Sequence, residues 1–405
     1  MTSQSSRLSR RGFLASMGIV AAGTTLVSCT KNDPSAMPAV PVSFGSSTVP
    51  FDGPHQAGIQ TPPQAHANLV GFNLKPAVTK REMGFLMRLW TEDARRLCSG
   101  IAPLADLEQE VVASPANLTI TCGVGANFFD RAGLSAQKPA WLAPIPAMSK
   151  DQLDEKSWPQ TDIVLQLCCD DPTTLSHATR HMIRTAADYT DYVWMQQGFL
   201  NANGTEPAGS TARNLFGFKD GTVNPSSDLD YDNIVWIQDS KSWLAGGSAM
   251  VVRRIAFNMD TWEMLDRDSR EVVFGRKVDS GAPLTGTNEF DTADFKKTDS
   301  LGLPIIDPAS HMARATNPED KPYQKIRRRA YSYDLPPVPG AEETANSGLV
   351  FICYQKDPTQ QFTPIQQRLD ESDRLNQWIT HIGSQVYFCP PGTDGTSYWA
   401  QELLA

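Results

Sequence analysis

The sequence predicts an α+β protein that consists of two ferredoxin-like units. The order strand, helix, strand, strand, helix, strand occurs twice along the chain, and this is the element order of that unit. The chain has 405 residues, enough for two domains of common size. Its hydrophobic content of 40% and charged content of 20% are those of an ordinary globular protein. We therefore expect two related sheets covered by helices.

The first unit is expected to begin with a strand and a capped amphipathic helix. Thr79-Lys80-Arg81-Glu82 is a capping box, and apolar residues recur behind it at helical spacing from Met83 to Leu97. Asp170-Asp171-Pro172 ends a later strand, and a second amphipathic helix follows it. The strands of this unit are expected at 68–74, 118–122, 162–169 and 192–199.

The second unit repeats this order. Strands are expected at 250–257, 325–333, 349–354 and 384–389, and helices at 260–274 and 362–380. The connection 201–247 between the units has few periodic apolar residues and many Gly, Asn, Asp and Ser residues. A long irregular connection of this kind is usually functional or disordered.

The N-terminus has the features of an export signal. Ser9-Arg10-Arg11-Gly12-Phe13-Leu14 is a twin-arginine pattern, and the apolar stretch 13–27 is too short for a stable spanning helix. Leu26-Val27-Ser28-Cys29 resembles a lipobox, and cleavage nearby without lipidation is the alternative. We expect a signal peptide at 1–29, a flexible linker at 30–50, and domains at 51–225 and 226–405.

Charge and cysteine content exclude several classes of protein. A net charge of −9 argues against nucleic acid or an anionic membrane surface as a partner. None of the seven cysteines forms a Cys-x-x-Cys or Cys-x-x-Cys-His motif, so zinc ribbons and covalent c-type haem are not supported. Cys168, Cys169, Cys353 and Cys389 lie in apolar, strand-like runs and are expected to be buried free thiols.

Two candidate site segments contain a glycine-flanked acid and a lone histidine. In Gly217-Phe218-Lys219-Asp220-Gly221-Thr222 the glycines would let the backbone approach a flat ligand, although the segment also suits a simple turn. His311 is a lone histidine, and such residues are more often structural than ligands. His177 and His181 lie four residues apart on one helix, where we expect a solvated face rather than a metal pair.

A third candidate is the strand Arg327-Arg328-Arg329-Ala330-Tyr331-Ser332-Tyr333. Alternate residues of a strand share a face, so Arg328 lies with small and apolar neighbours. A buried arginine needs an anionic or strongly polar partner. That partner is either a structural carboxylate of the core or a group in a functional site.

In this order, these segments resemble those of the dye-decolorizing peroxidases. The resemblance rests on the twin-arginine start, residues 51–59 and 214–222, the His311 segment and the Arg328–Tyr333 strand. It runs from about residue 51 to the C-terminus and is nearest to the exported branch that includes the deferrochelatase/peroxidase of iron transport. It implies a dimeric α+β barrel-like fold with non-covalent haem b in the C-terminal half.

The resemblance also implies roles for individual residues. His311 matches the proximal ligand of the haem iron, Asp220 the distal acid–base residue and Arg328 the distal arginine. Asp373 resembles the acid that orients the proximal imidazole. Arg314 would contact a haem propionate, although it follows the histidine by three positions where the family often has two. Gly221 and Thr222 would line the cofactor.

The implied function is a haem b peroxidase that uses hydrogen peroxide to oxidise dye-like or phenolic donors in one-electron steps. The alternative is a haem-handling deferrochelatase that releases iron from haem, with iron-uptake components as partners. A third hypothesis is a lipid-tethered binding module without a cofactor. We expect an exported protein, periplasmic or at the cell surface, with a possible lipid tether at Cys29. A homo-oligomer is compatible with the sequence.

Overall fold

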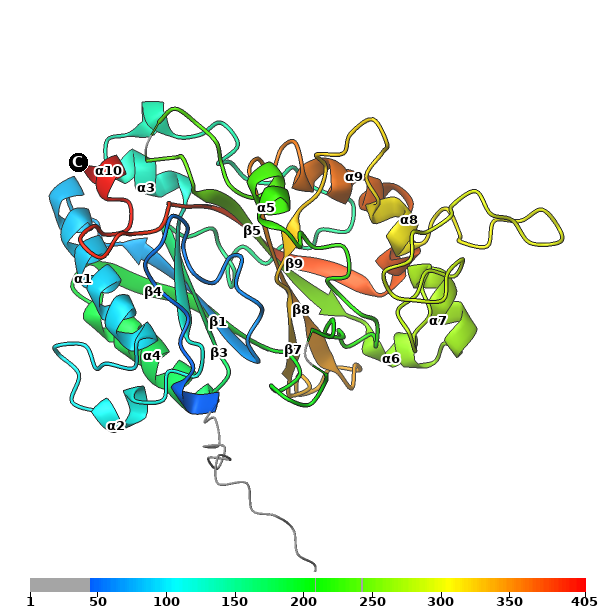
Figure 1. Cartoon of the computed structure of the whole chain (residues 1–405), viewed down its shortest axis with the longest axis horizontal. Coiled ribbons are helices and arrows are strands. Elements are labelled where there is room, and N and C mark those ends of the chain that lie inside the picture. The colour runs from blue at the N-terminus through cyan, green and yellow to red at the C-terminus, as the bar shows by residue number, and fades with distance from the viewer. Residues whose placement is uncertain (1–43, 208, 242) are drawn as a thin grey trace, which may run out of the picture. The chain divides into compact units, whose positions relative to one another are not determined.

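The computed structural model describes residues 44–207, 209–241 and 243–405, which belong to one compact unit (Figure 1). The twin-arginine pattern and the expected lipobox at Cys29 lie outside these residues, as does most of the expected linker. No helix of the described part of the chain is long and apolar enough to span a membrane.

The strands of the described residues form a single nine-stranded sheet that closes on itself. Its order is β5-β9-β2-β3-β1-β4-β7-β8-β6, and a further pairing of β5 with β8 joins the two ends into a barrel. The strands are β1 (His66–Leu74), β2 (Thr119–Val124), β3 (Ile163–Cys169), β4 (Thr190–Phe199), β5 (Ser248–Phe257), β6 (Arg327–Arg328), β7 (Tyr331–Leu335), β8 (Asn346–Gln355) and β9 (Ile379–Cys389).

The two expected ferredoxin-like units are both present in this barrel. The first contributes the strands β4-β1-β3-β2 and the second contributes β9-β5-β8-β7. In both units the strands therefore lie in the order fourth, first, third, second along the chain. The units join where Val124 pairs with Phe388 and Phe199 pairs with Ser332. The α+β, barrel-like fold expected from the sequence is therefore confirmed.

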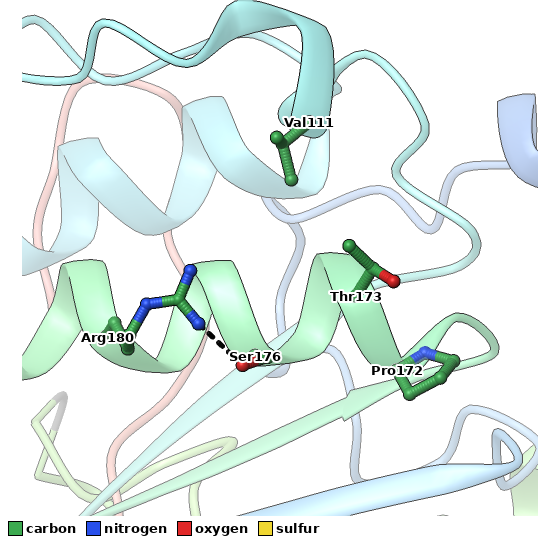
Figure 2. A pocket seen from close by; sticks show the side chains of 5 residues that line it. All are labelled: Val111, Pro172, Thr173, Ser176 and Arg180. Carbon is green, nitrogen blue, oxygen red and sulfur yellow. Dashed lines mark hydrogen bonds between the residues drawn. The ribbon is translucent and has the colours of Figure 1, made fainter.

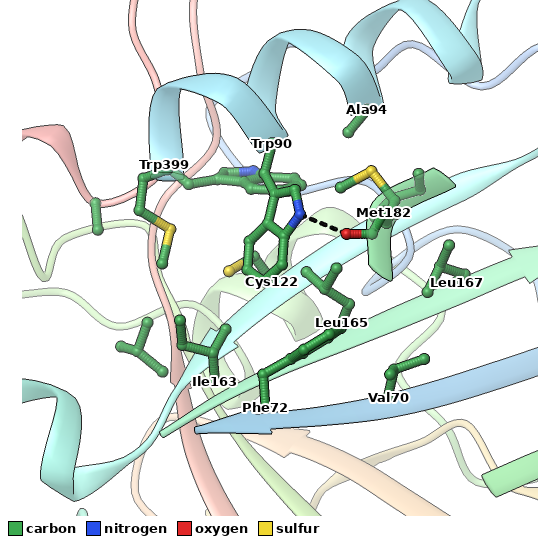
Figure 3. Close-up of a cluster of buried hydrophobic side chains, with 14 of the residues drawn as sticks. Val70, Phe72, Trp90, Ala94, Cys122, Ile163, Leu165, Leu167, Met182 and Trp399 are labelled. Atoms are coloured by element: carbon green, nitrogen blue, oxygen red, sulfur yellow. Dashed lines mark hydrogen bonds between the residues drawn. The ribbon is translucent and has the colours of Figure 1, made fainter. Parts of the chain in front are cut away.

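Two helices cover the outer face of the first unit because their apolar stripes pack on the sheet. In α1 (Lys80–Cys98) the capping box of Thr79 and Glu82 is present, as predicted. Helix α4 (Pro172–Thr185) begins with Asp171 as its N-cap. The two helices lie side by side, and the Trp90 indole donates a hydrogen bond of 2.9 Å to the Met182 carbonyl (Figure 3). Burial of each large apolar side chain in this cluster contributes roughly 1.5–3 kcal/mol.

Polar caps interrupt both predicted helices of the second unit, whereas three of its strands, β5, β8 and β9, are longer than predicted. The predicted helix 260–274 is divided into α6 (Met259–Glu263) and α7 (Arg267–Phe274), since Asp266 caps the second piece. The predicted helix 362–380 ends as α9 (Phe362–Ser372), followed by a 3-10 turn (Arg374–Gln377) that Asp373 caps. The predicted strand 325–333 is divided into β6 and β7, which pair with β8 in one continuous register.

The remaining described elements are short. Helix α8 (His311–Ala315) packs against α7 and α9 at the end of the molecule opposite α1 and α4 (Figure 1). The described residues of the connection 201–247 form no helix or strand other than α5 (Asp228–Ile234). The others are α2 (Gln109–Val112), α3 (Ala126–Arg131), α10 (Gln401–Leu404) and the 3-10 turns Phe44–Ser46 and Ser135–Gln137.

The prediction of a solvated face at His177 and His181 is wrong. Both imidazoles are buried, because the face of α4 that carries them meets α1 and the segment before α2. His177 Nε2 lies 2.6 Å from a carboxylate oxygen of Asp106, and His181 Nε2 lies 3.0 Å from one of Asp93. The prediction of buried free thiols at Cys168, Cys169, Cys353 and Cys389 is confirmed.

Candidate functional site

Two concave regions differ sharply in the chemistry that they offer. A pocket between α2 and α4 is lined by Val111, Pro172, Thr173, Ser176 and Arg180, and Arg180 is its only ionisable group (Figure 2). A larger cleft of about 770 Å³ lies between the irregular connection and the β6–β8 strands. Its lining includes Asp220, Gly221, Thr222, Asn224 and Arg328, so four of the predicted site residues line one cleft.

The loop that carries Asp220 is a tight turn fixed from two sides. Gly217 and Gly221 have positive φ values of 89° and 134°, which glycine adopts without the steric cost that other residues meet. The Asp220 amide donates to the Ala212 carbonyl at 2.9 Å. The loop therefore presents the Asp220 side chain to the cleft in a defined position.

Glu289, which the sequence analysis missed, anchors this loop through its side chain. Lys219 Nζ lies 2.6 Å from Glu289 Oε2, and the Thr222 hydroxyl donates to Glu289 Oε1 at 2.9 Å. Burial raises the pKa of Glu289, but hydrogen bonds from Lys219, Thr211 and Thr222 outweigh it and hold the pKa below its ordinary value. Thr222 thus bonds to a carboxylate of the protein itself.

Asp220 and Arg328 meet in the cleft. Arg328 Nη1 lies 3.3 Å from Asp220 Oδ1, and the two side chains are 22% and 18% exposed. Asp220 Oδ1 is buried and has no hydrogen-bond partner among the described residues, so the ion pair lacks hydrogen-bond geometry. The expectation that Arg328 lies on the buried face of the strand is wrong: Arg328 is 22% exposed at the cleft, whereas Arg327 and Arg329 are buried. Arg329 can be buried because the Thr61 carbonyl and Gln64 Oε1 accept hydrogen bonds from its guanidinium.

A second arginine lies near this pair. Burial lowers the pKa of Arg276, and the positive charge of Arg328 lowers it further. Arg276 Nη1 donates to the carbonyls of Gly281 and Glu289 at 2.6 and 3.1 Å. Arg276 therefore adds a second positive charge close to Arg328, although it is not a lining residue of the cleft.

His311 is held by the carboxylate predicted for it. His311 Nδ1 lies 2.6 Å from Asp373 Oδ2, and the Asp373 side chain is only 1% exposed. Asp373 Oδ1 accepts a hydrogen bond of 2.9 Å from the Leu375 amide, which fixes the carboxylate. An Asp373 carboxylate makes Nδ1 the protonated nitrogen and leaves Nε2 as the free acceptor.

Aromatic contacts connect His311 to the Asp220 loop. The Phe218 ring stacks on the Phe274 ring with centroids 3.9 Å apart, and Phe274 meets His311 edge-on at 5.7 Å. His311, Asp373 and Arg314 are not lining residues of the cleft. The predicted site therefore has two parts, a carboxylate–arginine pair and a carboxylate–histidine pair, joined by two phenylalanine rings.

Arg314 forms hydrogen bonds to two residues of α9. Its Nε donates to the Arg368 carbonyl at 2.9 Å, and its Nη2 lies 2.6 Å from Glu371 Oε2. Both partners belong to the protein, so the contact with a haem propionate stays a prediction.

The donor groups of this region fit haem. An imidazole with a carboxylate on one nitrogen and a free second nitrogen is a suitable axial ligand for haem iron. Asp220 Oδ1 and the Ser310 hydroxyl are buried polar atoms without partners in the described residues, and such atoms mark places where a ligand or water completes the structure. The described residues contain no group of three or more His, Cys, Asp or Glu side chains that could hold a metal ion by themselves.

The chain is similar to proteins of one family over nearly all of its length. The family models for the N-terminal and C-terminal parts of Dyp-type peroxidases match residues 56–200 and 211–394. Deferrochelatases from Yersinia pestis and Escherichia coli are 34% and 33% identical to it, over 98% of this chain and 95% and 97% of theirs.

Solved structures agree with this assignment. A DyP-type peroxidase from Cellulomonas bogoriensis is 42% identical, with a TM-score of 0.85 over 89% of this chain and 99% of that one. Ferric DtpA from Streptomyces lividans is 37% identical, with a TM-score of 0.85 over 90% of this chain and 100% of that one. The chain therefore belongs to the DyP-type peroxidase family and is a haem enzyme.

Proposed function

We propose that this protein reduces hydrogen peroxide at a haem b held by His311 and oxidises dye-like or phenolic donors in one-electron steps. The observation that carries the proposal is the Asp220–Arg328 pair, which lines a cleft at 3.3 Å without a hydrogen bond between its members. Bound haem supplies a redox-active iron that binds peroxide and stores its oxidising equivalents. His311 Nε2 is the proposed ligand of that iron.

Asp220 and Arg328 have different roles, proton transfer for Asp220 and charge stabilisation for Arg328. Asp220 Oδ1, which no protein donor occupies, takes the proton from the inner peroxide oxygen and returns it to the outer one, which leaves as water. The Arg328 guanidinium stabilises negative charge as the oxygen–oxygen bond breaks. Gly221 allows the backbone to approach the cofactor closely.

The Asp373 carboxylate acts through His311. Its charge-assisted hydrogen bond raises the electron density of the imidazole and fixes the direction of Nε2. His311 would hold the haem iron through Nε2, and a more basic imidazole would favour the oxidised state of that iron.

Replacing Asp220 by Asn tests this function. The variant keeps the shape of the side chain but removes its ability to accept a proton at the start of the reaction. We expect full haem occupancy and a peroxide reaction slowed by roughly 10²–10⁴-fold in stopped-flow measurements. An unchanged rate at full occupancy would exclude Asp220 as the acid–base group.

Release of iron from haem is the second candidate function. The observation that favours it is the 33–34% identity over 98% of this chain to proteins named deferrochelatase. Incubation of the haem complex without peroxide, followed by assay of free iron and intact porphyrin, separates the two functions. Iron release without turnover of a reducing dye would favour the second candidate.

We further propose export through the twin-arginine pathway to the periplasm or cell surface. The support is the pattern Ser9-Arg10-Arg11-Gly12-Phe13-Leu14 and the lipobox-like sequence before Cys29. Lipid labelling of wild type and Cys29→Ala in cell fractions tests the membrane tether. Association with iron-uptake components and homo-oligomerisation are tested by co-purification and by light scattering of the exported protein.

A further inference from the structure

The backbone of Arg328 is held by a side chain from the Asp220 loop. Asn224 Nδ2 donates to the Arg328 carbonyl at 2.9 Å, and the Arg328 amide donates to Asn224 Oδ1 at 2.9 Å. One side-chain amide thus bonds to both polar backbone groups of a single residue, as a neighbouring strand would, and the Arg328 carbonyl also accepts a hydrogen bond of 2.8 Å from Arg327 Nη1.

The position of Arg328 in the sheet explains why such a partner is needed. The amide of the next residue, Arg329, donates to the Ile352 carbonyl of β8 at 2.8 Å. Since successive residues of a strand direct their backbone groups to opposite edges, the amide and carbonyl of Arg328 face away from β8. Asn224 occupies that edge.

Asn224 is also fixed to the turn that carries Asp220. Its own amide donates to the Gly221 carbonyl at 2.9 Å, which closes a turn over residues 221–224. A Cβ atom on Gly221 would lie 3.2 Å from Asn224 Nδ2, so glycine permits this close packing. Asp220 and the backbone of Arg328 are therefore tied to one rigid turn.

We infer that Asn224 is a positioning residue that sets the placement of Arg328 relative to Asp220. The two charged groups form an ion pair at 3.3 Å without hydrogen-bond geometry, so their mutual attraction does not define an orientation. The Asn224 contacts to the Arg328 backbone supply that orientation and leave both charged groups free for peroxide. This inference rests on the proposed function, since it assigns Asn224 a part in the peroxide reaction.

A double-mutant cycle with holoenzyme tests the inference. The rate constant for the reaction with peroxide is measured by stopped flow for wild type, Asn224→Ala, Arg328→Leu and the double variant, each normalised to bound haem. We expect Asn224→Ala to slow the reaction roughly 10- to 100-fold, since a misplacement of about 1 Å costs up to this much. In the Arg328→Leu background, the same substitution should change the rate by less than about 2-fold, because the group that it positions is gone.

Additional variants separate positioning from stability. Asn224→Asp keeps the acceptor for the Arg328 amide but loses the donor to its carbonyl; it should also slow the reaction, and it replaces Asn224→Ala if that variant does not fold. Asn346→Ala removes a comparable amide contact, to the Pro336 carbonyl at 3.2 Å, and should leave the rate unchanged. A purely structural role for Asn224 would lower the melting temperature and haem content without changing the rate per bound haem.

The possible failures are distinguishable. If Arg328→Leu reacts with peroxide at the wild-type rate, the proposed role of Arg328 is wrong. If Arg328→Leu is slow while Asn224→Ala is not, or if Asn224→Ala slows both backgrounds equally, the positioning role of Asn224 is overturned.

Discussion

Replacing Asp373 by Asn removes the negative charge that contacts His311 Nδ1 and keeps the size and shape of the side chain at position 373. The substituted side chain still has an oxygen that can accept the 2.9 Å hydrogen bond from the Leu375 amide, so the cap of the 3-10 turn should persist. The other group of the Asn side chain is then its NH2, a donor, which faces the Nδ1–H of His311, so the 2.6 Å contact loses its charged acceptor. A hydrogen bond to a charged group contributes about 1.5–3 kcal/mol.

The consequence should appear at the haem iron. Loss of a carboxylate partner behind a metal-bound histidine typically costs about 10- to 100-fold in metal affinity or activity. We expect faster transfer of haem to excess apomyoglobin, a more positive reduction potential and a slower peroxide reaction, measured on the same preparation.

Asp370→Asn is the matched control because it lies three residues earlier on α9. Asp370 accepts hydrogen bonds from the Ser149 amide at 2.8 Å and from the Ser149 hydroxyl at 2.8 Å, with no contact to His311 among those described. It should leave the reduction potential unchanged. Equal shifts in Asp370→Asn and Asp373→Asn, or no shift in Asp373→Asn, would refute the reasoning.

Two further predictions concern carboxylate and imidazole groups outside the iron site. Glu289→Gln should lower the free energy of unfolding by about 1–3 kcal/mol at neutral pH, because Lys219 and Thr222 lose a charged partner. Since the pKa of Glu289 lies below its ordinary value of 4.5, this difference should be lost below pH 4.5 as the pH falls through the lowered pKa. A difference that persists in denaturant titrations after the carboxylate is protonated would contradict the prediction. Burial, aided by the charge of Arg253 and opposed by that of Asp370, lowers the pKa of His381 to about 3. Between pH 6.5 and that value the unfolded chain binds a proton that the folded chain does not, so stability should fall with falling pH by up to about 1.4 kcal/mol per unit, and His381→Gln should reduce this slope. An unchanged slope in His381→Gln would show that other groups cause the acid sensitivity.

The parts of the fold that local sequence determines were predictable. The capping box at Thr79 begins α1, and Asp171 with Pro172 begins α4, because these side chains bond to backbone groups within three residues. The interruptions of the second unit were missed, since Asp266 and Asp373 act as caps inside runs whose apolar spacing suggests one long helix.

The contact of Asp373 with His311 was predictable because the resemblance implied it. Strand alternation, in contrast, did not identify which arginines are buried, because the polar partners of Arg329 come from residues 61 and 64. Asn224 and Glu289 were not predictable, because their partners are 104 and 67–70 residues away in the sequence.

Long-range contacts also account for the wrong expectation at His177 and His181. Their spacing on α4 is compatible with either a solvated or a buried face. The carboxylates of Asp106 and Asp93 that pair with them come from positions 71 and 88 residues away. A local pattern contains no information on such partners.

The central claim is that His311 is the axial ligand of the haem iron, and His311→Ala tests it most directly. The absorption and resonance Raman spectra of the variant are recorded after expression with haem, before and after addition of imidazole. We predict that the variant loses the wild-type axial-ligand signature and retains little haem, and that added imidazole restores part of both by occupying the space of the missing ring. Full haem occupancy with the wild-type iron–ligand spectrum in His311→Ala would contradict the assignment.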